Sequence, residues 1–249
     1  MRSVYGKDFA SVYNEKWAFW GPKMWPFLRR AVMRHNPNAS TWLDLCCGTG
    51  SLLKLVCQNG FVATGVDLSP YQISYARRNA PDAKLMLQDI RSLSVRGKFD
   101  VVTCMFDSLN YLTSRRDLAM VFRKVRKVLN ARGLFVFDMN TFDGLQDNWC
   151  RTSAIHEPWM TLMVESSFDR ARARGRCLIT GFVKKGRLYR NFQEEHIERG
   201  YKAWEIEQAL QNAALSFKKC DGHSLGRPKK RSGRLLYVCR PEQAPTGVA

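Results

Sequence analysis

The part of the sequence best suited to chemistry is a carboxylate, Asp44, that comes shortly before two glycines, Gly48 and Gly50. The β-branched and apolar residues from Thr41 to Cys46 predict a short buried strand. Glycines directly after a strand indicate a turn at which the backbone approaches a partner closely or adopts a positive φ. The apolar residues from Ser51 to Val56 then have helical spacing. A strand, a Gly-x-Gly turn and a helix form one arm of a nucleotide-binding α/β unit.

The kind of nucleotide is constrained by three neighbouring positions. A dinucleotide-binding turn needs a third glycine three residues after Gly50, and Leu53 stands there. Asp44 would repel a phosphate and suits a ligand with a cationic part. Asp67, at the end of the next predicted strand, can accept hydrogen bonds from both hydroxyls of a ribose. The pattern therefore favours a nucleoside with a cationic group over a dinucleotide.

The elements that must position these residues alternate between strand and helix. Further strands are predicted at residues 61–66, 83–87, 99–105 and 134–139, with helices at 69–79 and 114–130 among the segments between them. This alternation predicts a parallel, doubly wound sheet. Ligands bind outside the carboxyl ends of such strands, so the polar residues there should line one site. They are Asp44, Asp67, Asp89, residues 106–110 and residues 138–140.

The pattern changes after Thr141. Three alternating runs at residues 160–168, 177–183 and 188–196 predict an antiparallel insertion of three strands. A helix at 202–214 and an antiparallel pair at 215–220 and 235–239 complete the chain. The predicted fold is α/β, a Rossmann-like doubly wound and mostly parallel seven-stranded sheet with an antiparallel three-stranded lid insertion.

The predicted domain organisation follows from these segments. Residues 1–40 form an N-terminal helical cap and residues 41–140 a cofactor-binding Rossmann-like core. Residues 141–200 form the lid insertion, residues 201–240 the helix and closing strand pair of the core, and residues 241–249 a tail. Aromatic residues near the start, including Tyr5, Phe9, Tyr13 and Trp17, are spaced by roughly four, as on one helical face. They either cover an edge of the core or close over a ligand.

The composition narrows the classes of protein that fit. The net charge is +18, and basic residues are in excess between Arg170 and Arg234, which suggests an acidic substrate, an anionic partner or a solubility effect. The eight cysteines form no CxxC pair and lack the ligand spacing of zinc sites, so reduced thiols and no metal are predicted. No apolar run reaches the roughly 18 residues of a membrane span, and the polar and charged first residues are not predicted to form a secretory signal. A cytoplasmic protein without a membrane partner is predicted.

Several motifs resemble those of class I S-adenosylmethionine-dependent methyltransferases. Leu43–Gly50 resembles the first motif, residues 65–70 and 88–90 the next two, and residues 99–104 and 133–138 the fourth and fifth strands. Tyr5, Phe9-Ala10, Tyr13 and residues 106–111, 137–140 and 195–201 resemble a small bacterial-type subgroup related to sugar-amine N-methyltransferases. The resemblance covers residues 5 to about 240 and departs from the subgroup at Cys47 and at Asn14.

The resemblance implies that S-adenosyl-L-methionine binds at the strand ends and leaves as S-adenosyl-L-homocysteine. Asp44 would lie near the amino group of its methionine part, Asp67 would hold the ribose, and Phe106 would line the channel of the methyl group. The residues implied to bind the cofactor are Tyr5, Tyr13, Asp44, Cys46, Gly48, Gly50, Asp67, Leu68, Asp89, Ile90 and Phe106. The residues predicted at the substrate are Asn110, Tyr111, Asn140 and His196.

Methyl transfer by in-line displacement mainly needs orientation and exclusion of water. A base is needed only if the nucleophile must lose a proton. His196 and Tyr13 are the candidate catalytic residues, and His196 ends a strand expected to fold over the sheet edge. The alternative is that His196 makes a structural hydrogen bond with Glu198 or Arg199.

The sequence therefore predicts a methyltransferase that N- or O-methylates a small molecule, with acidic or sugar-containing compounds as candidate acceptors. One alternative is a tRNA or rRNA methyltransferase that uses the basic surface of residues 170–234. A second alternative is a non-catalytic, cofactor-binding regulator. The protein could act as a monomer or as a homodimer.

Overall fold

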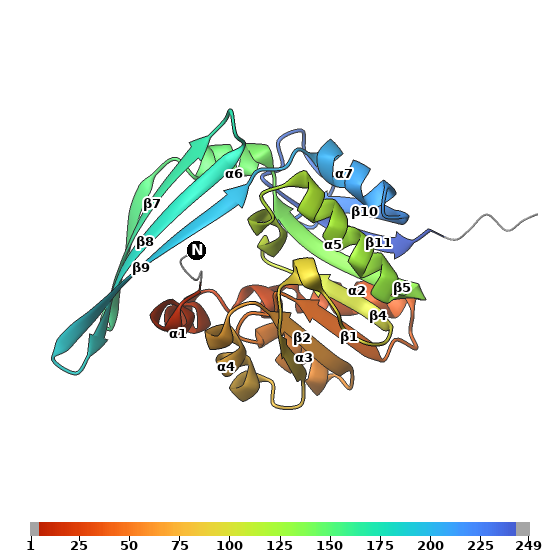
Figure 1. The fold of residues 1–249 in the computed structure, drawn as a ribbon, viewed down its shortest axis with the longest axis horizontal. Helices are drawn as coiled ribbons and strands as arrows, with labels where there is room; N and C mark the ends of the chain where they lie inside the picture. The colour runs from red at the N-terminus through yellow and green to blue at the C-terminus, as the bar shows by residue number, and fades with distance from the viewer. Residues whose placement is uncertain (1–4, 243–249) are drawn as a thin grey trace, which may run out of the picture.

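The computed structural model describes residues 5–242, which form two β-sheets with helices around the larger one (Figure 1). The larger sheet has seven strands in the order β10-β11-β5-β4-β1-β2-β3. Its strands are β1 (Thr41–Leu45), β2 (Val62–Asp67), β3 (Lys84–Leu87), β4 (Phe99–Cys104), β5 (Leu129–Asn140), β10 (Leu215–Asp221) and β11 (Arg234–Pro241). The first five run parallel, and β11 pairs antiparallel with both β5 and β10. The predicted mostly parallel seven-stranded sheet is confirmed.

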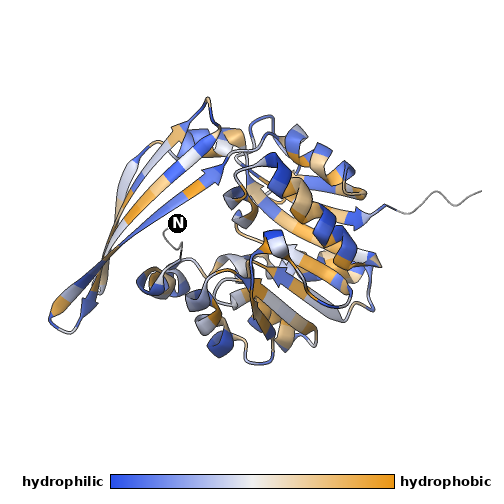
Figure 2. Cartoon of the chain, viewed as in Figure 1, coloured by the Kyte–Doolittle hydropathy of each residue, from blue (hydrophilic) through white to orange (hydrophobic). Residues whose placement is uncertain are grey.

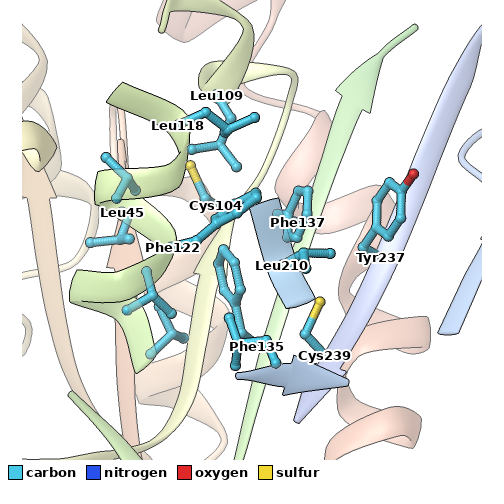
Figure 3. Packing of buried hydrophobic residues seen from close by; sticks show 14 of the residues in the cluster. Leu45, Cys104, Leu109, Leu118, Phe122, Phe135, Phe137, Leu210, Tyr237 and Cys239 are labelled. Carbon is cyan, nitrogen blue, oxygen red and sulfur yellow. The ribbon is translucent and has the colours of Figure 1, made fainter. Parts of the chain in front are cut away.

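Helices cover both faces of the large sheet, as in a doubly wound fold (Figure 1). One face packs on α5 (Arg115–Val128) and α7 (Ala203–Gln211), and the other on α2 (Trp20–His35), α3 (Ser51–Gln58) and α4 (Pro70–Asn79). Successive side chains of a strand point to opposite faces, so Leu43 joins the first cluster and Trp42 the second. Figure 3 shows Phe122 of α5 against Phe135 and Phe137 of β5. The strands of the large sheet are mostly apolar and the helices are amphipathic (Figure 2).

The smaller sheet corrects the predicted three-stranded lid. It has four antiparallel strands in the order β6-β7-β8-β9, namely β6 (Thr152–Glu157), β7 (Met160–Asp169), β8 (Arg174–Lys185) and β9 (Leu188–Arg199). Strand β6 is short, lies at an edge and is largely exposed, so its sequence lacks the apolar alternation of a buried strand. The short helix α6 (Phe142–Asn148), which joins the two sheets, was also not predicted.

Strand β5 begins earlier than its sequence suggested. The helix was predicted to run to residue 130 and the strand to begin at residue 134, but α5 ends at Val128 and the strand starts at Leu129. The pairing of β5 with β4 shifts here, because Phe99 pairs with Leu129 whereas Val101 pairs with Leu134. A Cβ at Gly133 would come within 2.9 Å of the carbonyl oxygen of Asn130. The glycine therefore permits a bulge in the strand.

Helix α1 (Lys7–Lys16) contacts both α4 of the core and β9 of the small sheet. Figure 1 shows it between the two sheets, beside the edge at which the strands of the large sheet end. Two short 3₁₀ turns, η1 (Ile90–Ser92) and η2 (Ser108–Tyr111), follow β3 and β4 at the same edge. Among residues 5–242, no helix is long and apolar enough to cross a membrane.

Candidate active site

The glycine turn after β1 has the geometry that its sequence predicted. Gly48 and Gly50 have φ values of 55° and 79°, which favour glycine. A Cβ at Gly50 would lie 3.1 Å from the Cα of Ala76, so the glycine also lets α4 pack closely. A Cβ at Gly48 would instead meet the ring of Tyr13 at 3.5 Å. Tyr13 of α1 therefore lies over this turn.

Asp67, at the end of β2, is bound to the same turn. Its Oδ2 accepts a hydrogen bond from the backbone amide of Gly48 at 2.9 Å, and its Oδ1 accepts one from the amide of Ser69 at 2.8 Å. Burial raises the pKa of Asp67, and these amide bonds oppose the rise. Each carboxylate oxygen keeps a free lone pair, so Asp67 can still accept hydrogen bonds from a ligand at the strand ends.

Asp44 lies inside the end of β1 and has no cationic partner among the described residues. The hydroxyl of Thr103 donates to its Oδ1 at 2.7 Å, and the indole of Trp42 donates to the same hydroxyl at 2.9 Å. Burial raises the pKa of Asp44 to about 7. A ligand with an ammonium group would stabilise the ionised form of this carboxyl.

Polar atoms without partners surround the glycine turn. Within the described part of the chain, the hydroxyl of Thr49 and both amide atoms of Gln72 are buried and make no hydrogen bond. The Oε1 of Gln72 lies 3.9 Å from the Cβ position of Gly48. Unsatisfied buried groups are rare in folded proteins, so these atoms fit a polar ligand that occupies the turn. The sequence did not single out Gln72, although its position in the first turn of α4 places it there.

Leu68, Asp89 and Ile90 occupy the neighbouring strand ends. Leu68 follows Asp67 and is 64% exposed, which leaves an apolar surface available to a ring. Asp89 caps η1 by accepting the amide of Arg91 at 2.8 Å and also accepts hydrogen bonds from its guanidinium. Ile90 is buried in the core below. Cys46 adopts a positive φ of 54° and its side chain packs against the core.

Aromatic side chains of α1 and of the segments around it close the site. Tyr5 packs on Tyr13 with ring centroids 5.5 Å apart, and on His196 at 5.3 Å. Phe106, after β4, lies 6.4 Å from Tyr13 and is stacked on Trp20 at 5.4 Å. The predicted aromatic face therefore covers the end of the large sheet and meets the small sheet.

The segment before α1 is bound to both sheets. The backbone amides of Tyr5 and Gly6 donate to the carboxylate of Glu194 on β9 at 2.9 and 2.8 Å. The hydroxyl of Ser69 donates to the carbonyl oxygen of Tyr5 at 2.7 Å. Asn79 donates to the side chain of Asn14 and to the carbonyl of Thr49. The N-terminal segment is thus fixed next to the glycine turn.

His196 does not bond to Glu198 or Arg199. Its Nδ1 pairs with the hydroxyl of Tyr111 at 2.8 Å, and this hydroxyl pairs with that of Tyr5 at 3.1 Å. The Nε2 of His196 is buried and has no hydrogen-bond partner among residues 5–242. Burial lowers the pKa of His196 to about 4, so its ring is neutral near pH 7.

Asn110 and Asn140, both predicted at the substrate, connect three segments. The amide of Asn110 donates to the carbonyls of Asn140 and Arg199 at 2.9 and 2.7 Å and accepts from the backbone of Asn140 at 3.0 Å. Asn110 is fully buried, and these bonds use both of its amide hydrogens. The side chain of Asn140 donates to Asp107 and to Glu198. Asn110 therefore fixes the segment from which Asn140 reaches the carboxylates.

A buried cluster of carboxylates lies beside the aromatic layer. The sequence placed Asp107 and Asp138 at the strand ends but did not single out Glu198 or Arg234, which lie with them. Asp138 accepts a hydrogen bond from the backbone amide of Phe106 at 2.6 Å and forms an ion pair with Arg234. Arg234 also pairs with Asp107 at 3.0 Å. The guanidinium lies over the ring of Trp20 at 4.8 Å. Burial raises the pKa of Asp107 and of Glu198, which adjoins the cluster.

Several basic residues of the segment 170–234 form ion pairs within the protein. Arg234 is buried in the cluster, Arg199 pairs with Glu205, and Arg176 and Arg172 pair with Glu195 and Asp169. The basic excess of residues 170–234 is therefore not one free surface.

Comparisons with known proteins agree on one class of enzyme. A family model described as a methyltransferase domain matches residues 43–133. YqeM of Bacillus subtilis (strain 168), named as a methyltransferase, is 28% identical over 93% of this chain and 95% of its own length. A dTDP-3-amino-3,4,6-trideoxy-alpha-D-glucopyranose N,N-dimethyltransferase of Streptomyces venezuelae is 27% identical over 95% of this chain and 92% of its own. The crystal structure of an S-adenosylmethionine-dependent methyltransferase from Clostridium acetobutylicum ATCC 824 superposes with a TM-score of 0.85 at 29% identity, covering 95% of this chain and 98% of that one.

Proposed function

We infer that this chain, which is a class I S-adenosylmethionine-dependent methyltransferase related to sugar-amine N-methyltransferases, methylates an amine nitrogen of a small, sugar-containing acceptor. Relatives that match most of the chain are named for the dimethylation of amino sugars. The observation that carries the proposal is the charge of the site. Burial raises the pKa of Tyr13, and the charges of Asp107, Asp67, Asp44 and Asp138 raise it further, so four carboxylates act electrostatically on the region around this ring.

This charge suits two cationic reactants. Arg234 is the buried cation of the described site, and its guanidinium is already shared between Asp107 and Asp138. A sulfonium and an ammonium, or the methylated amine that forms, would both be attracted to the remaining negative charge. A carboxylate acceptor would be repelled. The charge therefore favours an amine among the acceptors that the sequence left open.

The residues around the glycine turn fit the cofactor. Asp44, the amide of Gln72 and the hydroxyl of Thr49 would hold its amino-acid part, and Asp67 its ribose. Leu68, Asp89 and Ile90 would surround the adenine, and Phe106 and Tyr13 would lie near the methyl group. When bound, the cofactor supplies an activated methyl group on a sulfonium.

The chain itself orients the reactants and excludes water. Tyr5, Tyr13 and Phe106 form an aromatic wall on the side of α1. Strand β9 and α1 would enclose the acceptor, and Asn140, Tyr111 and His196 would contact it. His196 is neutral near pH 7, so it can accept a hydrogen bond from the acceptor, and Tyr13 remains a protonated phenol that can donate one.

The affinity for S-adenosylhomocysteine should rise about tenfold between pH 6 and pH 8. The reason is that an ammonium binds best to ionised Asp44, whose pKa lies at about 7 in the free protein, and the ionised fraction grows about tenfold across this range. Calorimetry in buffers of different ionisation enthalpy measures both the affinity and the proton released. Asp44→Asn should give a flat profile. A flat profile in the unmodified protein would contradict the role of Asp44.

The acceptor is tested with a matched series built on one nucleotide-linked sugar. The series carries an amine, an N-acetylamide or a hydroxyl at the same carbon. We expect methylation of the amine at a rate at least about 100-fold above that of the other two, because only the amine offers a basic lone pair and a cation that the carboxylates attract. Formation of S-adenosylhomocysteine, followed by chromatography, gives the rates. Faster methylation of the hydroxyl compound would overturn the proposed acceptor.

A further inference from the structure

Three alternate side chains of β9 face the site, and two of them have close hydrogen-bond partners that account for their burial. Glu194, His196 and Glu198 are buried, whereas Glu195 and Ile197 between them are exposed. Glu194 binds the backbone before α1 and His196 binds Tyr111. Glu198 is 4% exposed, and its one side-chain hydrogen bond within the described residues comes from Asn140 at 3.3 Å.

The groups around Glu198 destabilise the ionised form of its carboxyl. The carboxylates of Asp107 and Asp138 act on it electrostatically, and so does Arg234. Arg234 donates to both aspartates but not to Glu198. Burial raises the pKa of the phenols of Tyr5 and Tyr111 and of the thiol of Cys177, and the charge of Glu198 raises each of them further. A buried carboxylate without a cation of its own is expensive, so a cationic ligand would stabilise it.

Neighbouring polar atoms show independently that this region lacks a partner. The Nε2 of His196, which is 4% exposed, and the Nε of Arg234, which is 7% exposed, are both buried and make no hydrogen bond with the described chain. The rings of Tyr5 and Tyr111 lie 6.1 Å apart beside them. Buried groups of a complete core are nearly always paired. These atoms are therefore consistent with a site that a ligand completes.

We propose that Glu198 binds the acceptor amine and takes the proton that its nitrogen must lose before methylation. This inference rests on the proposed function, since it assumes an amine acceptor. The acceptor enters as an ammonium, R–NH₃⁺, which the negative charge around Glu198 attracts. One proton passes from nitrogen to the carboxylate of Glu198. The freed lone pair forms the N–CH₃ bond while the C–S bond breaks, and the electron pair of that bond stays on sulfur as a thioether.

Glu198 suits this task better than His196. The Nδ1 of His196 is occupied by Tyr111, and a neutral ring with a pKa of about 4 offers neither charge nor strong basicity to an ammonium. Burial and the charge of Asp107 raise the pKa of Glu198, which brings its basicity closer to that of the amine. The positive charge of a bound sulfonium opposes this rise and favours the ionised carboxylate.

The test compares Glu198→Gln with Glu195→Gln, a change on the exposed side of the same strand. Two cofactor analogues serve as probes without any reaction: S-adenosylhomocysteine, and sinefungin, which carries an amine where the cofactor carries its sulfonium methyl. We expect the unmodified protein to prefer sinefungin and Glu198→Gln to reduce this preference about tenfold, with the affinity for S-adenosylhomocysteine changed less than about threefold. Glu195→Gln should behave like the unmodified protein.

Kinetics provide the second measurement. With an amine acceptor and a cofactor concentration that is saturating at every pH, Glu198→Gln should lower kcat/KM for the acceptor about 100-fold, within the range that general bases contribute. It should also abolish the fall of kcat/KM at low pH. Glu198→Asp should restore part of the rate. If Glu198→Gln keeps both the preference for sinefungin and the fall of kcat/KM at low pH, the proposal is overturned. If this fall instead lies near pH 4 and is lost in His196→Gln, the proton is taken by His196 and the proposal is also overturned.

Two outcomes separate this inference from the function on which it rests. If S-adenosylhomocysteine does not bind the unmodified protein, or no amine is methylated, the proposed function fails. If both occur and Glu198→Gln has no effect, only the role of Glu198 fails. Should Glu198→Gln not fold, the pH dependence of the sinefungin preference in the unmodified protein decides. It should strengthen as Glu198 ionises, and a constant preference overturns the proposal.

Discussion

Replacing Asp67 with alanine should weaken the binding of S-adenosylhomocysteine about 100-fold or more. Asp67 accepts the amides of Gly48 and Ser69 and keeps lone pairs for the ribose hydroxyls. Each hydrogen bond to a charged acceptor contributes about 1.5–3 kcal/mol, and each 1.4 kcal/mol is tenfold in affinity. The substitution would also release the glycine turn, so the loss should exceed that of the ribose contacts alone. Isothermal titration calorimetry measures it.

The matched control is Asp82→Ala, an exposed carboxylate in the loop after α4, which should leave the affinity unchanged. Asp67→Asn keeps the size of the side chain but removes the charge, and its affinity should lie between those of the alanine variant and the unmodified protein. An alanine variant that binds within threefold of the unmodified protein would show that the ribose lies elsewhere.

Replacing Arg234 with methionine should lower the free energy of unfolding by about 3–5 kcal/mol, as expected when one member of a buried ion pair is removed. Arg234 is the shared partner of Asp107 and Asp138, and its loss would leave two buried carboxylates without a counter-ion. Urea denaturation near pH 7 measures the change. This loss of stability should shrink at lower pH, because protonation of Asp107, whose pKa burial raises, removes part of the uncompensated charge.

Arg231→Met is the control for this prediction. Arg231 pairs with Asp147, and both side chains are about half exposed, so its loss should change the free energy of unfolding by less than about 1 kcal/mol. If Arg234→Met were as stable as the control, the cluster would not depend on this cation. The charge argument for an amine acceptor would then lose its structural basis.

The parts of the fold that the sequence predicted are those with strong local patterns. Strand β1, the turn at Gly48 and Gly50, and α3 are consecutive in the chain, and their buried faces are read directly from apolar spacing. Strand β6 and the bulge at the start of β5 were missed for the opposite reason. An exposed edge strand needs no apolar face, and a bulge is decided by the pairing of β5 with β4.

The same distinction applies to the site. The cofactor turn is a local motif, so Asp44, Gly48 and Asp67 could be predicted from spacing. The carboxylate cluster brings together the end of β4, β5, β9 and β11, and its ion pair between Asp107 and Arg234 spans 127 positions in the sequence. In the sequence, Arg234 stood only at the end of the basic segment that begins at Arg170, which suggested an acidic substrate, an anionic partner or a solubility effect. Only the antiparallel pairing of β11 with β5 places it opposite Asn140, next to the carboxylates.

The most direct test of the central claim is to identify the atom that receives the methyl group. The protein is incubated with S-adenosylmethionine labelled with ¹³C in its methyl group and with the amine acceptor that reacts fastest, and the product is followed by NMR. The account predicts one new ¹³C-methyl signal coupled to carbons next to nitrogen, formed in step with S-adenosylhomocysteine. A label on oxygen, or no transfer to any amine while the cofactor binds, would contradict it.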